Sequence, residues 1–172
     1  DQNLGWSALG TLAGRNLVTV ADLDRAAQYN PSSISKNGYA YAIAAIPDAD
    51  HKAAAYKRIM EDSSLSNDAL TSTANGFLRG DVELRTPYYK PFFDSLLSMW
   101  DTRSIGMATR IVRGLYPRSL YNYGSAEGTG VSDNPSVALA QEWLRKNPSA
   151  PSALRRLILE AQDNAHRNMT GQ

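Results

Sequence analysis

The chain has 172 residues with 18 Lys and Arg, 17 Asp and Glu, and a formal net charge of +1. This near-neutral balance gives no electrostatic footprint for nucleic acid. The sequence contains no cysteine, which excludes disulfides, a cysteine nucleophile and thiolate metal sites, and no apolar run approaches the roughly 18 residues that a membrane-spanning helix needs.

The first half of the chain carries start and stop signals for a series of short helices. Thr19 and Asp22 form a capping-box pattern, Pro47 ends one helix, and Asn75-Gly76 resembles a left-handed helix stop. Either Asp48 or Asp50, and later either Ser66 or Asn67, can cap the next helix. The expected helices are Leu4 to Gly14, Thr19 to Tyr29, Gly38 to Ile46, Asp48 to Glu61, and Ser66 to Asn75.

One of these segments also has a pattern typical of a strand. Tyr39, Tyr41 and Ile43 alternate with alanines between Gly38 and Ile46. Alanine is a poor strand former and a good helix former, and the flanking segments all have helical patterns. We therefore predict a helix here, with a small-residue surface that a neighbouring helix can approach closely.

The centre of the chain predicts a helical hairpin. Thr86 and Pro87 suit a helix start, and Pro91 makes the first turn irregular or moves the regular helix toward that residue. A wide apolar face follows, formed by Phe92, Phe93, Leu96, Leu97, Met99 and Trp100. A short break at Asp101-Thr102 precedes a second helix from Ser104 to Arg113, stopped by Gly114. Two helices joined by such a short corner must lie against each other.

The remaining segments continue the helical pattern to the end of the chain. We expect a glycine-rich loop from Tyr121 to Gly130, a helix starting at Asp133 or Ser136, and a final helix from Ser152 to about Asn168. The overall prediction is an all-α protein, with antiparallel helix pairs stacked as an α-solenoid of the HEAT or armadillo kind. Residues 1–172 form a single helical domain in this interpretation.

No recognisable catalytic machinery is found among the polar residues. His51 and His166 do not form a His-Glu-x-x-His zinc motif, and no Gly-x-Ser-x-Gly nucleophile pattern occurs. Gly124, Gly128 and Gly130 lack the strand and the Lys-Ser/Thr pair of a phosphate-binding loop. Asn168-Met169-Thr170 matches the N-glycosylation acceptor pattern, but such a triplet arises easily by chance. Arg103, at the corner of the predicted hairpin, can stack on Trp100, reach an anion or form an inter-helix salt bridge.

Several segments taken together resemble one family. In order they are Ala42-Ile43-Ala44-Ala45-Ile46-Pro47-Asp48-Ala49 with Lys52-Ala53, Leu65-Ser66-Asn67, Asn75-Gly76-Phe77, Glu83-Leu84, Pro87-Tyr88-Tyr89, Phe93, Trp100, Arg103-Ser104, Gly114-Leu115-Tyr116-Pro117, and Ala153-Leu154-Arg155-Arg156 with Glu160. From Leu4 to Arg167 the chain resembles the C-terminal part of zinc-dependent aminopeptidases of the aminopeptidase N type, especially the actinobacterial branch. No single motif is diagnostic, and it is the ordered series that is specific.

The resemblance implies a non-catalytic, HEAT-like C-terminal domain that covers the active-site cleft and controls peptide access. This chain corresponds to the later portion of that domain. The resemblance implies that this chain holds no cofactor and that the parent enzyme holds zinc. It also implies two partners, the catalytic domain of the same polypeptide and peptide substrates. Neither nucleic acid nor membrane is an expected partner, and a cytoplasmic location is expected.

The resemblance also directs attention to three residues. We expect Tyr88, Tyr89 and Arg103 to lie near a surface that faces the substrate chamber or the neighbouring domain, with Arg103 meeting a peptide carboxylate and the tyrosines flanking it. No catalytic or metal-binding residue is expected in this chain. The alternative function is a free-standing helical-repeat module that binds another protein.

Overall fold

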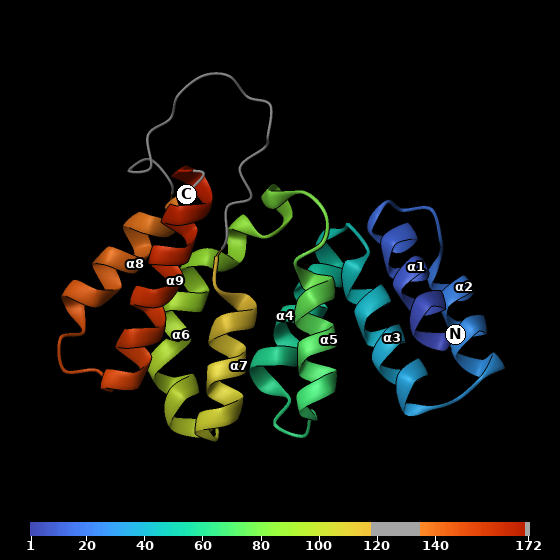
Figure 1. Cartoon of the computed structure of the whole chain (residues 1–172), viewed down its shortest axis with the longest axis horizontal. Coiled ribbons are helices and arrows are strands. Elements are labelled where there is room, and N and C mark those ends of the chain that lie inside the picture. Colours follow the sequence, from blue (N-terminus) through green and yellow to red (C-terminus); the bar gives the residue numbers. More distant parts are fainter. Residues whose placement is uncertain (118–134, 171–172) are drawn as a thin grey trace. The chain divides into compact units, whose positions relative to one another are not determined.

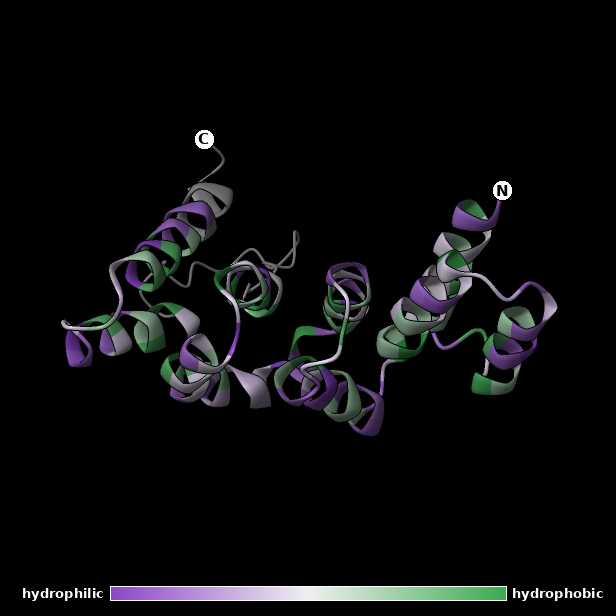
Figure 2. Cartoon of the chain, turned by 90° about the horizontal axis from the view of Figure 1, so that it is seen from below, coloured by the Kyte–Doolittle hydropathy of each residue, from purple (hydrophilic) through white to green (hydrophobic). Residues whose placement is uncertain are grey.

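The computed structural model describes residues 1–117 and 135–170, with side chains through residue 164. Every regular element in those ranges is a helix (Figure 1), which confirms the all-α prediction. Figure 2 shows hydrophilic and hydrophobic residues interleaved along the helices, as amphipathic helices require. The chain divides into two compact units, Asp1–Arg85 and Thr86–Gln172.

The first unit is built around its third helix. It contains α1 (Gln2–Gly14), α2 (Val20–Tyr29), α3 (Ser33–Ala45), α4 (Ala49–Glu61), α5 (Asn67–Phe77) and a 3₁₀ turn, η1 (Val82–Leu84). Helix α3 packs against each of the four other α-helices, and α4 also packs against α5. Helices α1, α3 and α5 lie side by side in Figure 1. The alanine-rich surface of α3 makes this dense packing possible, since Ala40, Ala42, Ala44 and Ala45 are all buried.

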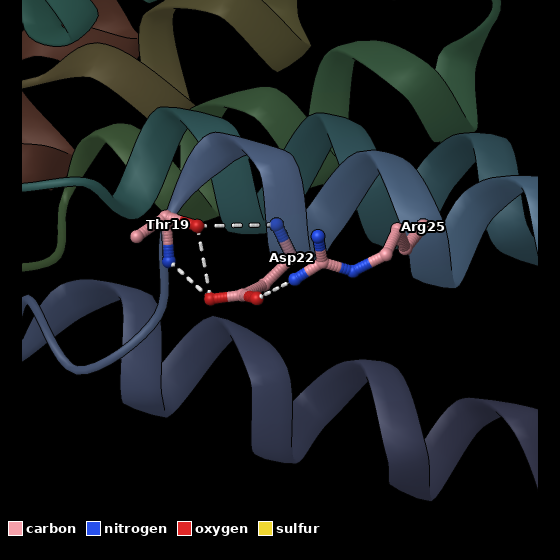
Figure 3. Close-up of polar contacts among 3 residues, drawn as sticks. All are labelled: Thr19, Asp22 and Arg25. Carbon is pink, nitrogen blue, oxygen red and sulfur yellow. Dashed lines mark hydrogen bonds and ion pairs between the residues drawn. The ribbon is translucent and has the colours of Figure 1, made fainter.

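Short polar side chains begin each α-helix of the first unit. The caps are Asp1, Thr19, Ser32, Asp48 and Ser66, and each accepts a hydrogen bond from a backbone N–H of the first turn. At α2 the predicted capping box is confirmed (Figure 3). The Thr19 hydroxyl oxygen accepts from the Asp22 N–H at 3.2 Å, and the Asp22 carboxylate accepts from the Thr19 N–H at 2.8 Å.

The second unit consists of two packed helix pairs. A 3₁₀ turn, η2 (Thr86–Tyr88), leads into α6 (Tyr89–Thr102), which is followed by α7 (Ile105–Leu115), α8 (Pro135–Lys146) and α9 (Ser152–Thr170). Helix α6 contacts α7 and α8, and α9 contacts the same two helices. The predicted hairpin is therefore confirmed as α6 and α7. Its corner falls at Arg103-Ser104, two residues later than predicted, and Ser104 caps α7.

Aromatic packing forms the core of this hairpin. The rings of Phe92, Phe93 and Tyr116 meet edge to face, with centroids between 5.2 and 6.1 Å apart. All three side chains are buried, as is Leu96 one turn further along α6. Of the predicted apolar face, Phe92, Phe93, Leu96 and Met99 are buried, whereas Trp100 is half-buried and Leu97 is exposed, so the face is narrower than predicted.

Two predicted glycine stops are wrong. Helix α5 continues through Gly76 to Phe77, and α7 continues through Gly114 to Leu115. The left-handed residue after α5 is Gly80, with φ of 87°. A Cβ atom at Gly76 would overlap the backbone carbonyl of Tyr41, so this glycine allows α5 to approach α3 closely and does not end the helix.

Other boundaries shift by a few residues. Helix α3 begins at Ser33, five residues before the predicted start, because Ser32 caps it. Helix α1 ends at Gly14 as predicted, and Asn16 then adopts a left-handed conformation with φ of 58°. The predicted loop from Tyr121 to Gly130 lies outside the described residues, as does Asp133.

Candidate functional site

The first unit contains a polar pocket of about 420 Å³ over the helices that lie side by side, and we call it the α1–α3–α5 groove. Each of the three helices contributes part of its wall. Its lining consists of Asn3, Trp6, Ser7, Ile34, Asn37, Gly38, Tyr41, Asp68, Thr71, Ser72 and Asn75.

Two aromatic side chains and two glycines hold the groove's walls together. Trp6 of α1 packs over Gly38 of α3, where a Cβ atom would overlap the indole ring. In return, Tyr41 of α3 packs over Gly10 of α1, where a Cβ atom would overlap the phenol ring. This reciprocal packing fixes α1 against α3 and places both rings in the groove.

The polar atoms of both rings already have partners. The indole N–H of Trp6 donates to the hydroxyl of Ser35 at 3.4 Å, and the phenol oxygen of Tyr41 accepts from Nε of Arg79 at 2.8 Å. The Arg79 guanidinium also lies 5.9 Å from the centre of the Tyr41 ring. Both rings border the groove, with Trp6 buried at 6% exposure and Tyr41 half-buried.

A buried lysine joins two of the helices that line the groove. Lys52 of α4 has no exposed surface, and its Nζ donates to the carbonyls of Ala44 at 2.7 Å and Gly76 at 3.1 Å. These carbonyls belong to the C-terminal turns of α3 and α5, where helix dipoles favour a positive charge. The Phe77 ring centre is 6.0 Å from the same nitrogen. Lys52 thus donates to the Ala44 carbonyl at the end of α3 and adds a donor to the Gly76 carbonyl, which also accepts from the Arg79 N–H at 2.9 Å.

Burial lowers the pKa of Lys52 to about 8. The nearby Arg85 charge acts in the same direction, while the Asp48 carboxylate raises the pKa. A buried amine with a lowered pKa is the usual form of a lysine nucleophile. Lys52 is closed off from solvent and bonded to two carbonyls, so its geometry supports a structural role.

The structure does not bring the three predicted site residues together. Tyr88 ends η2 and is half-buried, and Tyr89 begins α6 and is 7% exposed. Arg103 follows the last residue of α6 and is half-buried. A helix of 14 residues is about 20 Å long, so the tyrosines and Arg103 lie at opposite ends of α6.

The histidines and carboxylates give no metal site in the described part of the chain. His51 lies in the first turn of α4, and its Nδ1 is 2.8 Å from both carboxylate oxygens of Asp48, the residue that caps this helix. Across residues 1–117 and 135–164, no three His, Cys, Asp or Glu side chains gather as metal ligands would. The side chain of His166 lies outside the described residues. Among the described helices, none combines the length and apolar character needed to cross a membrane.

The sequence interpretation did not identify Lys52 or the groove. The burial of Lys52 could have been predicted from the sequence. Lys52 shares one face of α4 with Ala55 and Ile59, at the helical spacing of three and four residues. The groove could not be detected from the sequence, because its lining comes from three helices and their packing is known only once the fold is known.

Comparison with known proteins gives two findings. The sequence model of the ERAP1-like C-terminal domain family matches residues 1–167. Aminopeptidase N of Streptomyces lividans is 27% identical to the chain over 174 residues. That alignment covers 100% of this chain and 19% of the Streptomyces protein, so the chain spans about one fifth of the length of this relative.

Proposed function

Because the chain belongs to the ERAP1-like C-terminal domain family, we propose that it is a non-catalytic C-terminal domain of a zinc aminopeptidase and controls the access of peptides to the active site. The observation that carries this proposal is the family match over residues 1–167, together with similarity of the whole chain to one fifth of an aminopeptidase N. The all-α fold of packed helix pairs agrees with it.

In this proposal, the zinc chemistry belongs to a catalytic part of the same polypeptide. We assign no catalytic step to this chain, because the family match is to a C-terminal domain. Its contribution is steric: a rigid helical wall next to a cleft admits flexible peptides and excludes folded proteins. The partners are the catalytic domain and the peptides that pass it.

The proposal is tested by removing this region from the longer enzyme. We expect the intact enzyme to cleave short peptides and to spare a folded protein with the same N-terminal residue. The shortened enzyme, checked for folding by circular dichroism, should cleave both. Unchanged discrimination in a folded shortened enzyme would contradict access control. If the shortened enzyme does not fold, the alternative test measures the cleavage rate of the intact enzyme on peptides of increasing length. A cleavage rate that does not depend on peptide length would contradict access control.

Arg103 remains a proposed chamber-facing or domain-facing residue, with Tyr88 and Tyr89 at the far end of the same helix. We expect Arg103→Ala in the longer enzyme to alter kcat/KM differently for short and long peptides. Equal kinetics across peptide lengths would remove Arg103 from the proposal.

A free-standing interaction module is the second candidate. Packed helix pairs commonly serve as binding surfaces, and fold alone does not define function. The family match favours the aminopeptidase domain. Recovery of this sequence only as a separate short polypeptide would favour the module.

A further inference from the structure

One side of α1 is exposed in the folded first unit. Among the described helices, α3 is the one that packs closely against α1, on the face that carries Trp6, Gly10 and Ala13. The opposite side carries Leu4 and Leu12, which are 72% and 37% exposed. Single exposed leucines are ordinary on a protein surface, so the arrangement of the residues around them decides whether this side has a partner.

Five exposed residues follow one another along this side, and we call them the α1 stripe. They are Asp1, Leu4, Ala8, Leu12 and Arg15. Successive members are three or four residues apart, so at 3.6 residues per turn they lie on one face of the helix. Asp1 and Arg15 are the N-cap and C-cap, and α1 itself contains no charged side chain. The stripe is therefore an apolar surface with one negative and one positive charge at its two ends.

The α1 stripe is symmetric about Ala8. Leu4 and Leu12 lie four residues to either side of Ala8, and Asp1 and Arg15 lie seven residues to either side. If two copies of α1 pack antiparallel about a two-fold axis at Ala8, each Leu4 faces the partner's Leu12 and each Asp1 faces the partner's Arg15. Such reciprocal contacts define an isologous two-fold interface.

The chemistry of these contacts favours the antiparallel pair. Ala8 has a single methyl group, so two helices can approach closely on the axis. The leucines are removed from water against one another, and the charges at both ends meet their opposites. A parallel pair would instead place Asp1 beside Asp1 and Arg15 beside Arg15, so like-charge repulsion selects the antiparallel direction.

The apolar surface continues beyond the end of the helix. Leu17 is 66% exposed, and its N–H donates to the carbonyl of Leu12 at 2.9 Å. Even with this residue, the interface is little more than one helix face from each copy. Small interfaces belong to weak and transient complexes, so we expect a dimer that dissociates on dilution.

The geometry points to a second copy of this chain as the partner of the α1 stripe, packed antiparallel about a two-fold axis at Ala8. A partner helix of one charge sign complements only one end of the stripe, whereas a second copy complements both ends. The other candidate occupant is a segment of the same longer polypeptide, and the experiment includes it. This inference goes beyond peptide access and does not depend on it.

The first test is analytical ultracentrifugation of the N-terminally acetylated chain, since acetylation removes the amine charge next to Asp1. From micromolar to millimolar concentration, we expect the mass to rise from 18.8 kDa toward twice that value. Leu4→Asp should weaken association by about tenfold or more, because it places a carboxylate against the partner's leucine. Ile105→Asp is the matched control, since Ile105 is 73% exposed in the first turn of α7 and lies outside the stripe. This control should associate like the original chain.

An exchange of charges tests the antiparallel direction. Arg15→Glu places like charges together at both ends of the pair and should raise the dissociation constant by about 5- to 30-fold. Asp1→Lys combined with Arg15→Glu restores opposite charges and should recover most of the lost affinity. Asp1 also caps α1, so circular dichroism checks that the helix is kept. A purely structural effect of one substitution would not be reversed by the other.

A single cysteine locates the two-fold axis. The chain contains no cysteine, so Ala8→Cys introduces one thiol per copy at the point where the two helices approach most closely. We expect mild oxidation to give a disulfide-linked dimer, because a disulfide requires close Cα atoms. Ser7→Cys is the control. Ser7 is also exposed, but it is turned by about 100° toward the α1–α3–α5 groove and should give little dimer.

Three results with the chain itself would overturn the inference: a mass that stays at 18.8 kDa up to millimolar concentration, association that Leu4→Asp leaves unchanged, or no recovery of affinity in the charge-exchanged variant. A result with the longer enzyme would also overturn it. If that enzyme is monomeric and its Ala8→Cys thiol is protected from thiol reagents, a segment of the same polypeptide covers the stripe. None of these results bears on access control, which is measured by peptide cleavage.

Discussion

At the scale of single residues, the buried Lys52 is the strongest departure from the ordinary rules of surface charge. Lysine is rarely fully buried unless paired, and here the partners are two carbonyls at helix ends. Its ammonium therefore carries a desolvation cost that the hydrogen bonds and helix dipoles offset in part.

This cost gives a pH dependence that can be measured. The unfolded chain holds the Lys52 proton up to a pKa of 10.5, whereas the folded protein releases it near 8. Between these values the unfolded state binds more protons, so the free energy of unfolding rises with pH. From pH 7.5 to 9.5 we expect urea denaturation to show the original chain gaining about 1–2 kcal/mol relative to Lys52→Met.

Above pH 10 a second group lowers the stability of both proteins. Burial raises the pKa of Tyr116, so its phenol stays protonated in the folded protein while an unfolded tyrosine ionises, and stability falls above that pH. Parallel pH profiles for the original chain and Lys52→Met between pH 7.5 and 9.5 would refute the lowered pKa.

The capping box at α2 gives a second prediction at this scale. Thr19→Ala removes the hydroxyl that accepts from the Asp22 N–H, and we expect a loss of about 0.5–2 kcal/mol at pH 7 in urea denaturation. Hydrogen bonds from Thr19 lower the pKa of Asp22, so the contribution of this carboxylate is present at neutral pH and lost as pH falls through its lowered folded pKa. The difference between the two proteins should therefore shrink in acid. A difference that is constant from pH 7 to pH 2.5 would argue against the carboxylate's part in the box.

At the scale of elements, glycines decide how closely the helices of the first unit approach. Gly10, Gly38 and Gly76 each face a neighbouring helix at a distance that leaves no room for a Cβ atom. Glycine weakens a helix by about 1 kcal/mol relative to alanine, so close packing must offset this cost at each position.

A pair of substitutions separates packing from helix propensity. Gly76→Ala should lower the free energy of unfolding by about 1–3 kcal/mol, since the new methyl meets the rigid backbone of α3. Gly5→Ala should raise it by up to about 1 kcal/mol, because nothing lies within 4 Å of its Cβ position in α1. Urea denaturation of both variants measures the contrast, and a stabilised Gly76→Ala would contradict the close approach of α5 to α3.

The elements themselves were largely predictable from the sequence, because their signals are local. Capping residues and apolar spacing predicted the helices and the central hairpin, and Thr19 and Pro47 mark their boundaries well. Gly76 misled the prediction because a glycine that ends a helix and one that admits a neighbouring helix look alike in sequence. The groove was beyond prediction for a similar reason: Asn3, Asn37 and Asn75 come together only when three helices pack.

At the scale of the whole molecule, the account depends on the chain being one domain of a larger enzyme. The two units described here supply packed helices, a polar groove and no gathering of metal ligands among the described residues. The proposed role of this domain in peptide access rests on the family match and not on these features. The family match and the 27% identity relate the chain to the C-terminal domain of aminopeptidase N-like proteins.

The most direct test of this claim is the mass of the native polypeptide that contains this sequence. An antibody raised against the segment from Pro87 to Arg103, used on a denaturing gel of whole cells, measures it. Because the chain covers 19% of its Streptomyces relative, we predict a band about five times heavier than 18.8 kDa, and aminopeptidase activity that purifies with it. A band near 18.8 kDa with no heavier precursor would contradict the account and favour a free-standing binding module.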